Sequence, residues 1–347
     1  MKRKYLIILA SILFLFGCSQ KEKTNSKVRP SSTENEIVLL QSNLLEKTSK
    51  LEYYNYNLKK MSTTKINANG LEQIIPLKEK KILIPGSYNS ELIHISSNKV
   101  DIEESRYPSP LSIIPYNDGE ITLYNYDEKG DINFYTYQFV RENKKIWTKR
   151  FEGVPFLIRK YDDNLFVYIK DMKTNDESSS YSLMIIDLKR GTVDKKINIH
   201  GAYIATEILK KKNYIYISLV DTNNSNSFVI RYTNGTWKEK RIKIKETGIV
   251  KMFMDNEYFY TLHYKENNTL LVKHSKNLDR DIKIVKIKKG ISNPILDTEK
   301  NILFYTYVKN DKQTYLASYN INQNKEKNSV KVSGSIQDIV LIKDIQQ

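Results

Sequence analysis

The sequence predicts an all-β fold, a seven-bladed β-propeller in which each blade is a four-stranded antiparallel sheet. Three observations lead to this prediction. A strand-like segment recurs along most of the chain, glycines recur at nearly the same interval of about 45 residues, and each interval has room for four short strands. Units of this size with four antiparallel strands are typical of propeller blades.

The recurring segment begins with a polar pair and continues with β-branched and aromatic residues. It reads DNLFVYIK from Asp163, KNYIYISL from Lys212, NEYFYTLH from Asn256 and KNILFYTY from Lys300, and GEITLYNY from Gly119 precedes them. Apolar residues on both faces indicate a buried strand. The last strand of a unit, such as VDKKINI, alternates charged and apolar residues, which indicates an outer strand with one solvated face.

Half of the 12 glycines mark one recurring turn, and they are Gly70, Gly153, Gly201, Gly248, Gly290 and Gly334. Glycine adopts positive φ without a steric penalty, so this turn is expected to need that conformation or a close approach of two strands. The regular spacing favours a propeller over tandem β-sandwiches, which are the main alternative fold and give no reason for it.

The units account for nearly the whole chain. Complete units span 71–108, 109–153, 154–200, 201–247, 248–290 and 291–333. The part-unit 36–70 holds three strands and the part-unit 334–347 holds one, so together they make the seventh blade. The C-terminal strand would then join the N-terminal blade and close the ring, which removes exposed sheet edges. Six or eight blades are the alternatives, and residues 42–56 could form a capped helix instead of a loop and strand.

The N-terminus has the layout of an export signal. Lys2, Arg3 and Lys4 precede an apolar run from Tyr5 to Gly17. This run is shorter than the roughly 20 apolar residues that a membrane-spanning helix needs, and a basic segment before a short apolar one is typical of a secretory signal peptide.

The end of this run, Leu15-Phe16-Gly17-Cys18, resembles the lipobox of bacterial lipoprotein signal peptides. Leu15 and Gly17 match that pattern, whereas Phe16 departs from it because the residue there is usually smaller. The resemblance implies that Cys18 is lipidated and becomes the N-terminus after cleavage. The alternative is an ordinary signal peptide, but Cys18 is the only cysteine and has no disulfide partner in the chain, which favours lipidation.

Residues after Cys18 are polar and charged up to Glu36, with Val28 as the one aliphatic residue. Such a segment buries too little apolar surface to fold by itself and is interpreted as a flexible tether. We therefore expect a signal peptide at 1–17, a lipidated cysteine and tether at 18–35, and a propeller at 36–347.

The formal net charge of +16 raises the question of an anionic partner. A basic exported protein could bind anionic lipid, anionic wall polymer or nucleic acid. Lysines alternate with apolar residues, as in KRIKIK from Lys240 and IKIVKIKK from Ile282, so we expect them on the solvated faces of strands. No nucleic-acid partner is expected.

The sequence holds no motif for nucleophilic catalysis, nucleotide binding or metal binding, so no catalytic residue, metal or cofactor is predicted. His263 and His274 fall in neighbouring predicted strands and are interpreted as structural. If a ligand site exists, we expect it at the mouth of the central channel, where the turns between blades share one face. The candidate residues on those turns are Arg106, Tyr107, Glu152, His200, Tyr203, Glu246 and Asn293.

These features predict a lipid-anchored protein on the extracytoplasmic face of the cell membrane. We expect a non-catalytic binding or scaffold module with a protein or an anionic cell-envelope polymer as partner. The alternatives are a hydrolase or lyase acting on envelope glycan from the same platform, and a purely electrostatic binder of anionic wall polymer.

Overall fold

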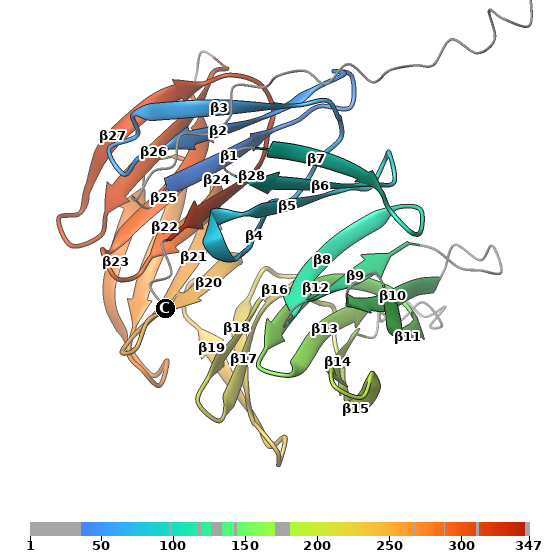
Figure 1. Cartoon of the computed structure of the whole chain (residues 1–347). Helices are drawn as coiled ribbons and strands as arrows, with labels where there is room; N and C mark the ends of the chain where they lie inside the picture. The colour runs from blue at the N-terminus through green and yellow to red at the C-terminus, as the bar shows by residue number, and fades with distance from the viewer. Residues whose placement is uncertain are drawn as a thin grey trace, which may run out of the picture.

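The computed structural model describes residues 36–343, except 97–98, 117–118, 126–133, 142–143, 171–180, 267, 288 and 310–311. The predicted signal peptide, Cys18 and the tether lie outside the described residues. The described part of the chain forms seven four-stranded antiparallel sheets around a common axis (Figure 1). The predicted all-β propeller with four-stranded antiparallel blades is confirmed, and the number of sheets equals the predicted number of blades.

In each sheet one strand lies nearest the axis, which we call the axis-side strand, and the other three follow it outward. From the axis outward, the first sheet contains β28 (Ile336–Ile342), β1 (Glu36–Gln41), β2 (Ser49–Tyr54) and β3 (Lys60–Ile66). The second contains β4 (Ile75–Pro76), β5 (Ile82–Gly86), β6 (Glu91–Ser96) and β7 (Lys99–Glu104), with the short 3-10 helix η1 (Lys78–Lys80) between its first two strands. The third contains β8 (Pro110–Tyr116), β9 (Gly119–Tyr124), β10 (Phe134–Arg141) and β11 (Lys144–Glu152).

The remaining sheets repeat the same order. The fourth contains β12 (Val154–Tyr161), β13 (Asn164–Lys170), β14 (Tyr181–Asp187) and β15 (Thr192–Ile199), and the fifth β16 (Tyr203–Lys211), β17 (Tyr214–Asp221), β18 (Ser227–Thr233) and β19 (Glu239–Ile244). The sixth contains β20 (Ile249–Met254), β21 (Phe259–Lys265), β22 (Asn268–His274) and β23 (Asp281–Ile287), and the seventh β24 (Ile291–Asp297), β25 (Ile302–Val308), β26 (Thr314–Asn320) and β27 (Lys325–Val332).

The core lies between neighbouring sheets. The second strand of a sheet is almost entirely buried, as in β13 and β21, whereas the outermost strand alternates exposed and partly buried residues, as in β27. Buried side chains from two sheets share one cluster: Tyr168 of the fourth sheet packs with Ile217 of the fifth, for example. This gradient of burial is the one that the apolar and alternating segments predict.

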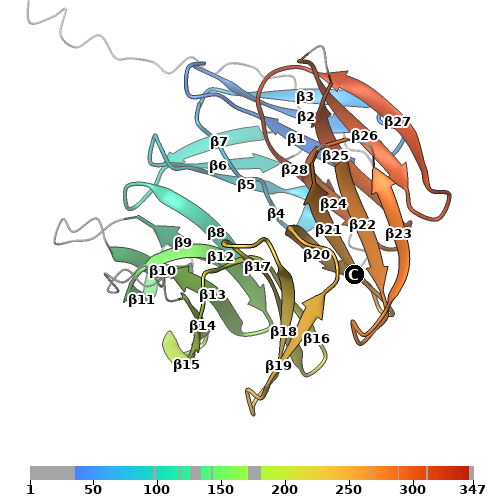
Figure 2. The ribbon, with the colours of Figure 1, turned by 180° about the vertical axis from the view of Figure 1, so that it is seen from behind.

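The two ends of the chain meet in the first sheet, where β28 pairs antiparallel with β1, with Val38 opposite Val340 (Figures 1 and 2). The predicted joining of the C-terminal strand to the N-terminal blade is therefore confirmed. The neighbouring seventh sheet is tied to the first at the same place, because Tyr56 Oη donates to Asp297 Oδ2 at 2.6 Å. Residues 42–56 form a loop and strand β2, so the alternative of a helix there is wrong.

The recurring glycines lie at the ends of the sheets where one sheet leads to the next. Gly70, Gly153, Gly201, Gly248 and Gly334 have φ between 62° and 124°, as the sequence predicts, whereas Gly290 is not among the residues with positive φ. At Gly153 a Cβ atom would lie 2.7 Å from the carbonyl oxygen of Lys170, so a larger residue would collide with the neighbouring strand. Because the strands alternate in direction, loops between second and third strands lie at this same end, which we call the turn face.

Within the described residues, no helix is long and apolar enough to cross a membrane.

A chain that ends at Ser335 lacks β28 and is expected to lose at least about 4 kcal/mol of free energy of unfolding, because single large-to-small substitutions in a core already cost about 2–5 kcal/mol. The truncation removes the buried side chains of Ile339 and Ile342 and exposes their partners on β1. Urea unfolding followed by circular dichroism measures the loss. A chain that ends at Lys343 is the control and should unfold like the full-length protein; equal midpoints for both truncations would contradict the structural role of β28.

Candidate functional site

The turn face exposes most of the large apolar side chains that remain outside the core. Ten such side chains are exposed among the described residues, with exposed fractions from 36% to 92%. Eight of them lie at the turn face: Leu44, Leu45, Tyr88, Leu111, Phe156, Ile204, Tyr264 and Val308. The other two, Ile282 and Ile284, lie on the outermost strand β23. The exposed apolar surface is therefore concentrated on one face and spread around the ring.

A β-bulge near the start of the axis-side strands contributes to this arrangement. In β8 and β12 the register shifts after Pro110 and after Pro155, so Leu111 and Phe156 have no partner on the next strand. The same shift occurs in β16, β20, β24 and β28. A bulge leaves one residue unpaired and redirects its side chain. At Leu111 and Phe156 the unpaired residue is one of the exposed apolar ones.

The structure spreads the sequence-predicted candidates over several turns, although Arg106 shares one turn with Tyr107 and His200 shares another with Tyr203. Arg106 and Tyr107 are in contact, with the guanidinium carbon 5.7 Å from the ring centroid. The ring of Tyr203 lies against Phe228, and Arg241 Nη1 donates to Tyr203 Oη at 3.3 Å. Since those two partners belong to the outer strands of its own sheet, Tyr203 points away from the axis.

The other four candidates lie one to a turn or strand end. His200 is exposed between β15 and β16, and Glu246 is half-buried between β19 and β20. Asn293 lies in the bulge of β24 with φ of 50°. Glu152 is the last residue of β11, and its side chain is outside the described part. That these seven residues contact a ligand stays a prediction.

Charged side chains that the sequence reasoning did not select meet near the axis. Glu207 of β16 is buried between two cations from the neighbouring axis-side strands. Arg159 of β12 donates to it from two of its three guanidinium nitrogens, Nε to Oε1 at 2.6 Å and Nη2 to Oε2 at 3.0 Å. Lys251 of β20 lies 2.7 Å from Oε2. Burial would raise the pKa of Glu207, but Lys251 and Arg159 together hold that pKa below its usual value.

Asp338 of β28 lies nearby and titrates differently. Burial raises its pKa to about 6, although it accepts hydrogen bonds from the backbone N–H groups of Ile74 and Ile339, both at 2.8 Å. A carboxyl group with such a pKa is suited to proton transfer. Both oxygens of Asp338 are already engaged, however, and so are both oxygens of Glu207. These contacts tie neighbouring sheets together near the axis.

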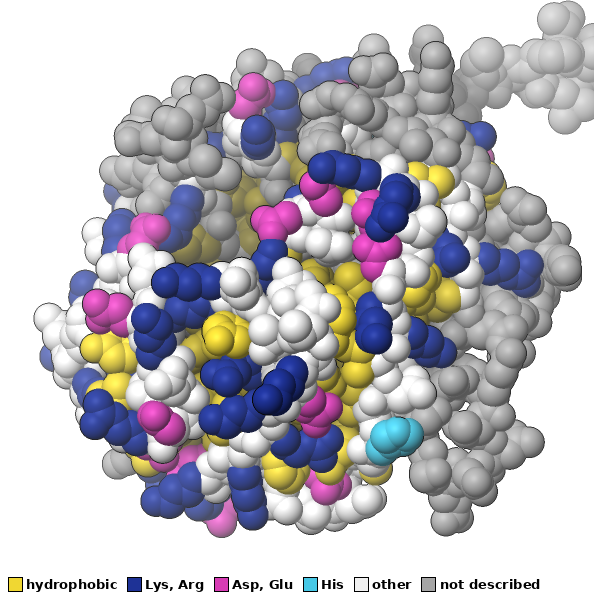
Figure 3. All heavy atoms as spheres, turned by 90° about the horizontal axis from the view of Figure 1, so that it is seen from below, with side chains coloured by type: hydrophobic (Ala, Val, Ile, Leu, Met, Phe, Trp, Pro, Cys, Tyr) yellow, Lys and Arg dark blue, Asp and Glu magenta, His cyan; other side chains and the backbone are white. Residues whose placement is uncertain are grey.

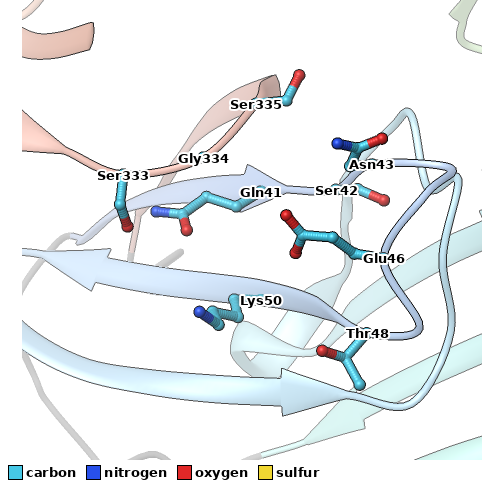
Figure 4. Close-up of a pocket in the computed structure, with 9 residues that line it drawn as sticks. All are labelled: Gln41, Ser42, Asn43, Glu46, Thr48, Lys50, Ser333, Gly334 and Ser335. Carbon is cyan, nitrogen blue, oxygen red and sulfur yellow. The ribbon is translucent and has the colours of Figure 1, made fainter. Parts of the chain in front are cut away.

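Two adjoining hollows open on the turn face of the first sheet, next to the turn from β27 to β28. One has a volume of about 190 Å³ and is lined by Gln41, Ser42, Asn43, Glu46, Thr48, Lys50, Ser333, Gly334 and Ser335 (Figure 4). The other has a volume of about 240 Å³ and is lined by Ser42, Asn43, Leu44, Gly70, Leu71, Glu72, Tyr88, Ser335 and Gln337. They share the lining residues Ser42, Asn43 and Ser335, and we refer to the two hollows together as the groove.

His263 and His274 are linked inside the sixth sheet through hydrogen bonds to the hydroxyl group of Thr261. The carbonyl oxygen of Thr247 accepts from His263 Nδ1 at 3.1 Å, and the hydroxyl of Thr261 lies between His263 Nε2, at 2.7 Å, and His274 Nε2, at 2.6 Å. His274 Nδ1 is 2.8 Å from Asp281. Burial lowers the pKa of His263 to about 4, so its ring is neutral near pH 7. Among the described residues, no group of three or more His, Cys, Asp and Glu side chains could hold a metal ion.

No protein-family model matches the sequence, and a comparison with curated proteins gives no match either. Solved structures do resemble it. A candidate 6-phosphogluconolactonase from Bacteroides fragilis is 10% identical, with a TM-score of 0.63 over 90% of this chain and 100% of that one. A protein of unknown function from Desulfotomaculum acetoxidans is 12% identical, with a TM-score of 0.59 over 89% of this chain and 99% of that one.

A third similar structure is that of apo AztD from Citrobacter koseri, at 11% identity and a TM-score of 0.54 over 89% of this chain and 98% of that one. At such low identity these likenesses show the fold alone. They agree with the propeller architecture and assign no activity to this chain.

Substitution of Glu207 by Gln leaves Arg159 and Lys251 without their shared counter-charge, so a loss of about 3 kcal/mol of free energy of unfolding is expected at pH 7. Because the pKa of Glu207 is lowered in the folded state, its stabilisation is present above about pH 4.5 and disappears as the pH falls through the folded-state pKa. The stabilities of the wild type and the variant should therefore approach one another as the pH falls below 4.5. Urea unfolding between pH 3 and pH 8 tests this.

Glu299→Gln is the matched control, because Glu299 is an exposed carboxylate paired with Lys343 on the surface. Such pairs contribute little to stability, so this variant should unfold like the wild type. A Glu207→Gln protein that is equally stable at pH 7 would show that the charged cluster is not needed for the ring.

Proposed function

We propose that this chain is a lipid-anchored, extracytoplasmic propeller that acts as a non-catalytic binding module and docks a protein partner on its turn face. The observation that carries this proposal is the concentration of exposed apolar side chains there. Eight of the ten exposed large apolar side chains among the described residues belong to this one face. Large exposed apolar patches on a folded protein mark interaction sites, and aromatic side chains are enriched in them.

The position of the anchor fits this use of the turn face. Strand β1 begins at Glu36, which lies opposite Ile342, the last residue of β28. Because β28 starts at the turn face, both Glu36 and Ile342 lie at the opposite end of the sheet. A tether at residues 18–35 would therefore join the ring on the far side from the turn face, so that a membrane-bound ring could present its turn face outward.

The enzymatic alternative receives less support from the site. The carboxylates of Glu207 and Asp338 near the axis each accept hydrogen bonds or ion pairs on both oxygens. The likeness to a candidate lactonase rests on the fold alone. A hydrolase acting on envelope glycan at the axis would need a carboxyl group there that can reach its substrate.

The electrostatic alternative is weakened by the distribution of the basic residues. Exposed lysines follow the outermost strands, for example Lys195 and Lys196 on β15 and Lys327 on β27. On the face drawn in Figure 3, Lys and Arg side chains are scattered, with acidic and apolar side chains among them. A polymer-binding site would be expected to gather cations along one track.

Lipidation is tested by growing cells that express the full-length protein with a labelled fatty acid. The wild type is expected to take up label, and Cys18→Ala is expected to lose it entirely, since the chain holds no other cysteine. Ser19→Ala, a substitution at the next position, is the control and should be labelled like the wild type. Uptake of the labelled fatty acid by the Cys18→Ala protein would contradict the proposal of a lipid anchor at Cys18.

The docking face is tested with a photo-crosslinking residue placed at Ile204, at Phe156 or at Ile284. All three positions are exposed and apolar, but Ile284 lies on the outermost strand of the sixth sheet. Irradiation of intact cells should give the same protein adduct from Ile204 and Phe156 and none from Ile284. Adducts of equal yield at all three positions, or at none, would argue against a partner on the turn face.

A further inference from the structure

The groove on the turn face of the first sheet, formed by the two adjoining hollows, has the properties of a ligand site. Polar side chains line its first hollow, whereas the second also contains Leu44 and Tyr88, two of the exposed apolar side chains of the turn face. We propose that this groove binds a neutral saccharide unit of a glycan. The inference goes beyond the docking of a protein and does not depend on it.

A buried donor without a partner points into the first hollow. Gln41 is 6% exposed, and its Nε2 finds no hydrogen-bond acceptor among the described residues. Leaving such a donor unpaired costs about 1–3 kcal/mol, which a bound acceptor oxygen would recover. Figure 4 shows the Gln41 amide directed toward Ser333 and Gly334, the Glu46 carboxylate on the other side of the hollow, and Lys50 on the strand below them.

The lining matches the chemistry of sugar hydroxyl groups. Each hydroxyl both donates and accepts, and the hollow offers the Gln41 amide, the hydroxyl of Thr48, the Glu46 carboxylate and the Lys50 ammonium. In the first hollow the Glu46 carboxylate and the Lys50 ammonium balance in charge, and the second hollow adds the carboxylate of Glu72, so the groove favours a neutral ligand over a phosphate or another anion. A volume of about 190 Å³ is below that of sites for drug-sized ligands, roughly 300–1,000 Å³, and suits a single small ring.

The second hollow adds an aromatic surface. Tyr88 is 58% exposed and its ring lies over Gly70, where a Cβ atom would come within 2.6 Å of the ring carbon Cδ2. Glycine at this position therefore makes room for the ring. The face of an aromatic ring packs well against the C–H groups of a sugar, while the sugar's hydroxyl groups point to the polar side of the groove.

The walls of the groove are held in place without a ligand. Ser42 N donates to Ser335 O at 3.0 Å, and Leu71 N donates to Ser42 Oγ at 2.8 Å. Gln337 Nε2 donates both to Ser42 O and to Ser335 Oγ, each at 2.9 Å. Such bonds fix the loop after β1 against the turn before β28. A site with fixed walls loses little conformational entropy on binding, which favours affinity for a small ligand.

The test is a calorimetric titration of the purified, detergent-solubilised protein with chitotriose and with maltotriose, two neutral trisaccharides, and with inorganic phosphate. At least one trisaccharide is expected to bind, and phosphate is not. Gln41→Leu and Tyr88→Ala should each raise the Kd about tenfold or more, because each removes about 1.4 kcal/mol of interaction. Tyr88→Phe keeps the ring and should bind within about twofold of the wild type.

Phe156→Ala is the matched control, since it removes an exposed aromatic ring from the same face at a different sheet. It should leave the Kd unchanged. If Gln41→Leu fails to fold, as judged by thermal unfolding, the comparison of Tyr88→Ala with Tyr88→Phe decides alone. The proposal is overturned if neither trisaccharide binds at millimolar concentration, if phosphate binds in their place, or if the variants bind as tightly as the wild type. The cross-linking pattern at Ile204 is independent of all these outcomes.

Discussion

The pairing of β28 with β1 is the interaction on which the rest of the structure depends. Without it the first sheet would present the unpaired edge of β1, and the axis would be open on one side. The pairing joins residues about 300 positions apart, so it forms only after the chain has completed the ring, at a considerable cost in loop-closure entropy. The buried Ile339 and Ile342 offset that cost by filling the spaces toward the neighbouring sheets, and Asp297 adds a polar tie between the first and seventh sheets.

Once the ring is closed, two local devices decide what the turn face presents. Positive φ at most of the marker glycines allows the chain to pass from one sheet to the next in very few residues, which brings the sheets close together. The bulges in the axis-side strands then add one unpaired residue just inside each of these turns. At Leu111 and Phe156 that residue is apolar and exposed, so a packing device of the fold also supplies side chains to the surface proposed for docking.

Much of this fold could be predicted from the sequence because each unit repeats the same order of four strands with the same pattern of burial. The second strand of each sheet is buried on both faces and is therefore mostly apolar, whereas the fourth is buried on one face and alternates polar with apolar residues. Because this pattern recurs from unit to unit, an exceptional residue in one unit does not hide it. The marker at Gly290 shows the limit of that reasoning, since its position fits the repeat although its φ does not require glycine. The ion pairs of Glu207 could not be predicted from the sequence, because they depend on how three axis-side strands are aligned relative to one another. The bulges in those strands set this alignment. A signal existed, however: Arg159, Glu207 and Lys251 are charged residues that stand next to apolar residues within the first strands.

The groove was beyond sequence reasoning for a different reason: its two walls come from opposite ends of the chain. Strand β1 runs from Glu36, where the proposed tether would join, to Gln41, which lines the groove, and over its whole length it pairs with β28. One short strand thus connects the anchor, the closure and the groove. A ligand that needs Gln41 and the turn around Gly334 together binds only the closed ring, so by linkage it stabilises closure by RT ln(1 + [L]/Kd). Occupancy of the groove would therefore strengthen the sheet through which any pull between an anchored tether and a docked partner must pass.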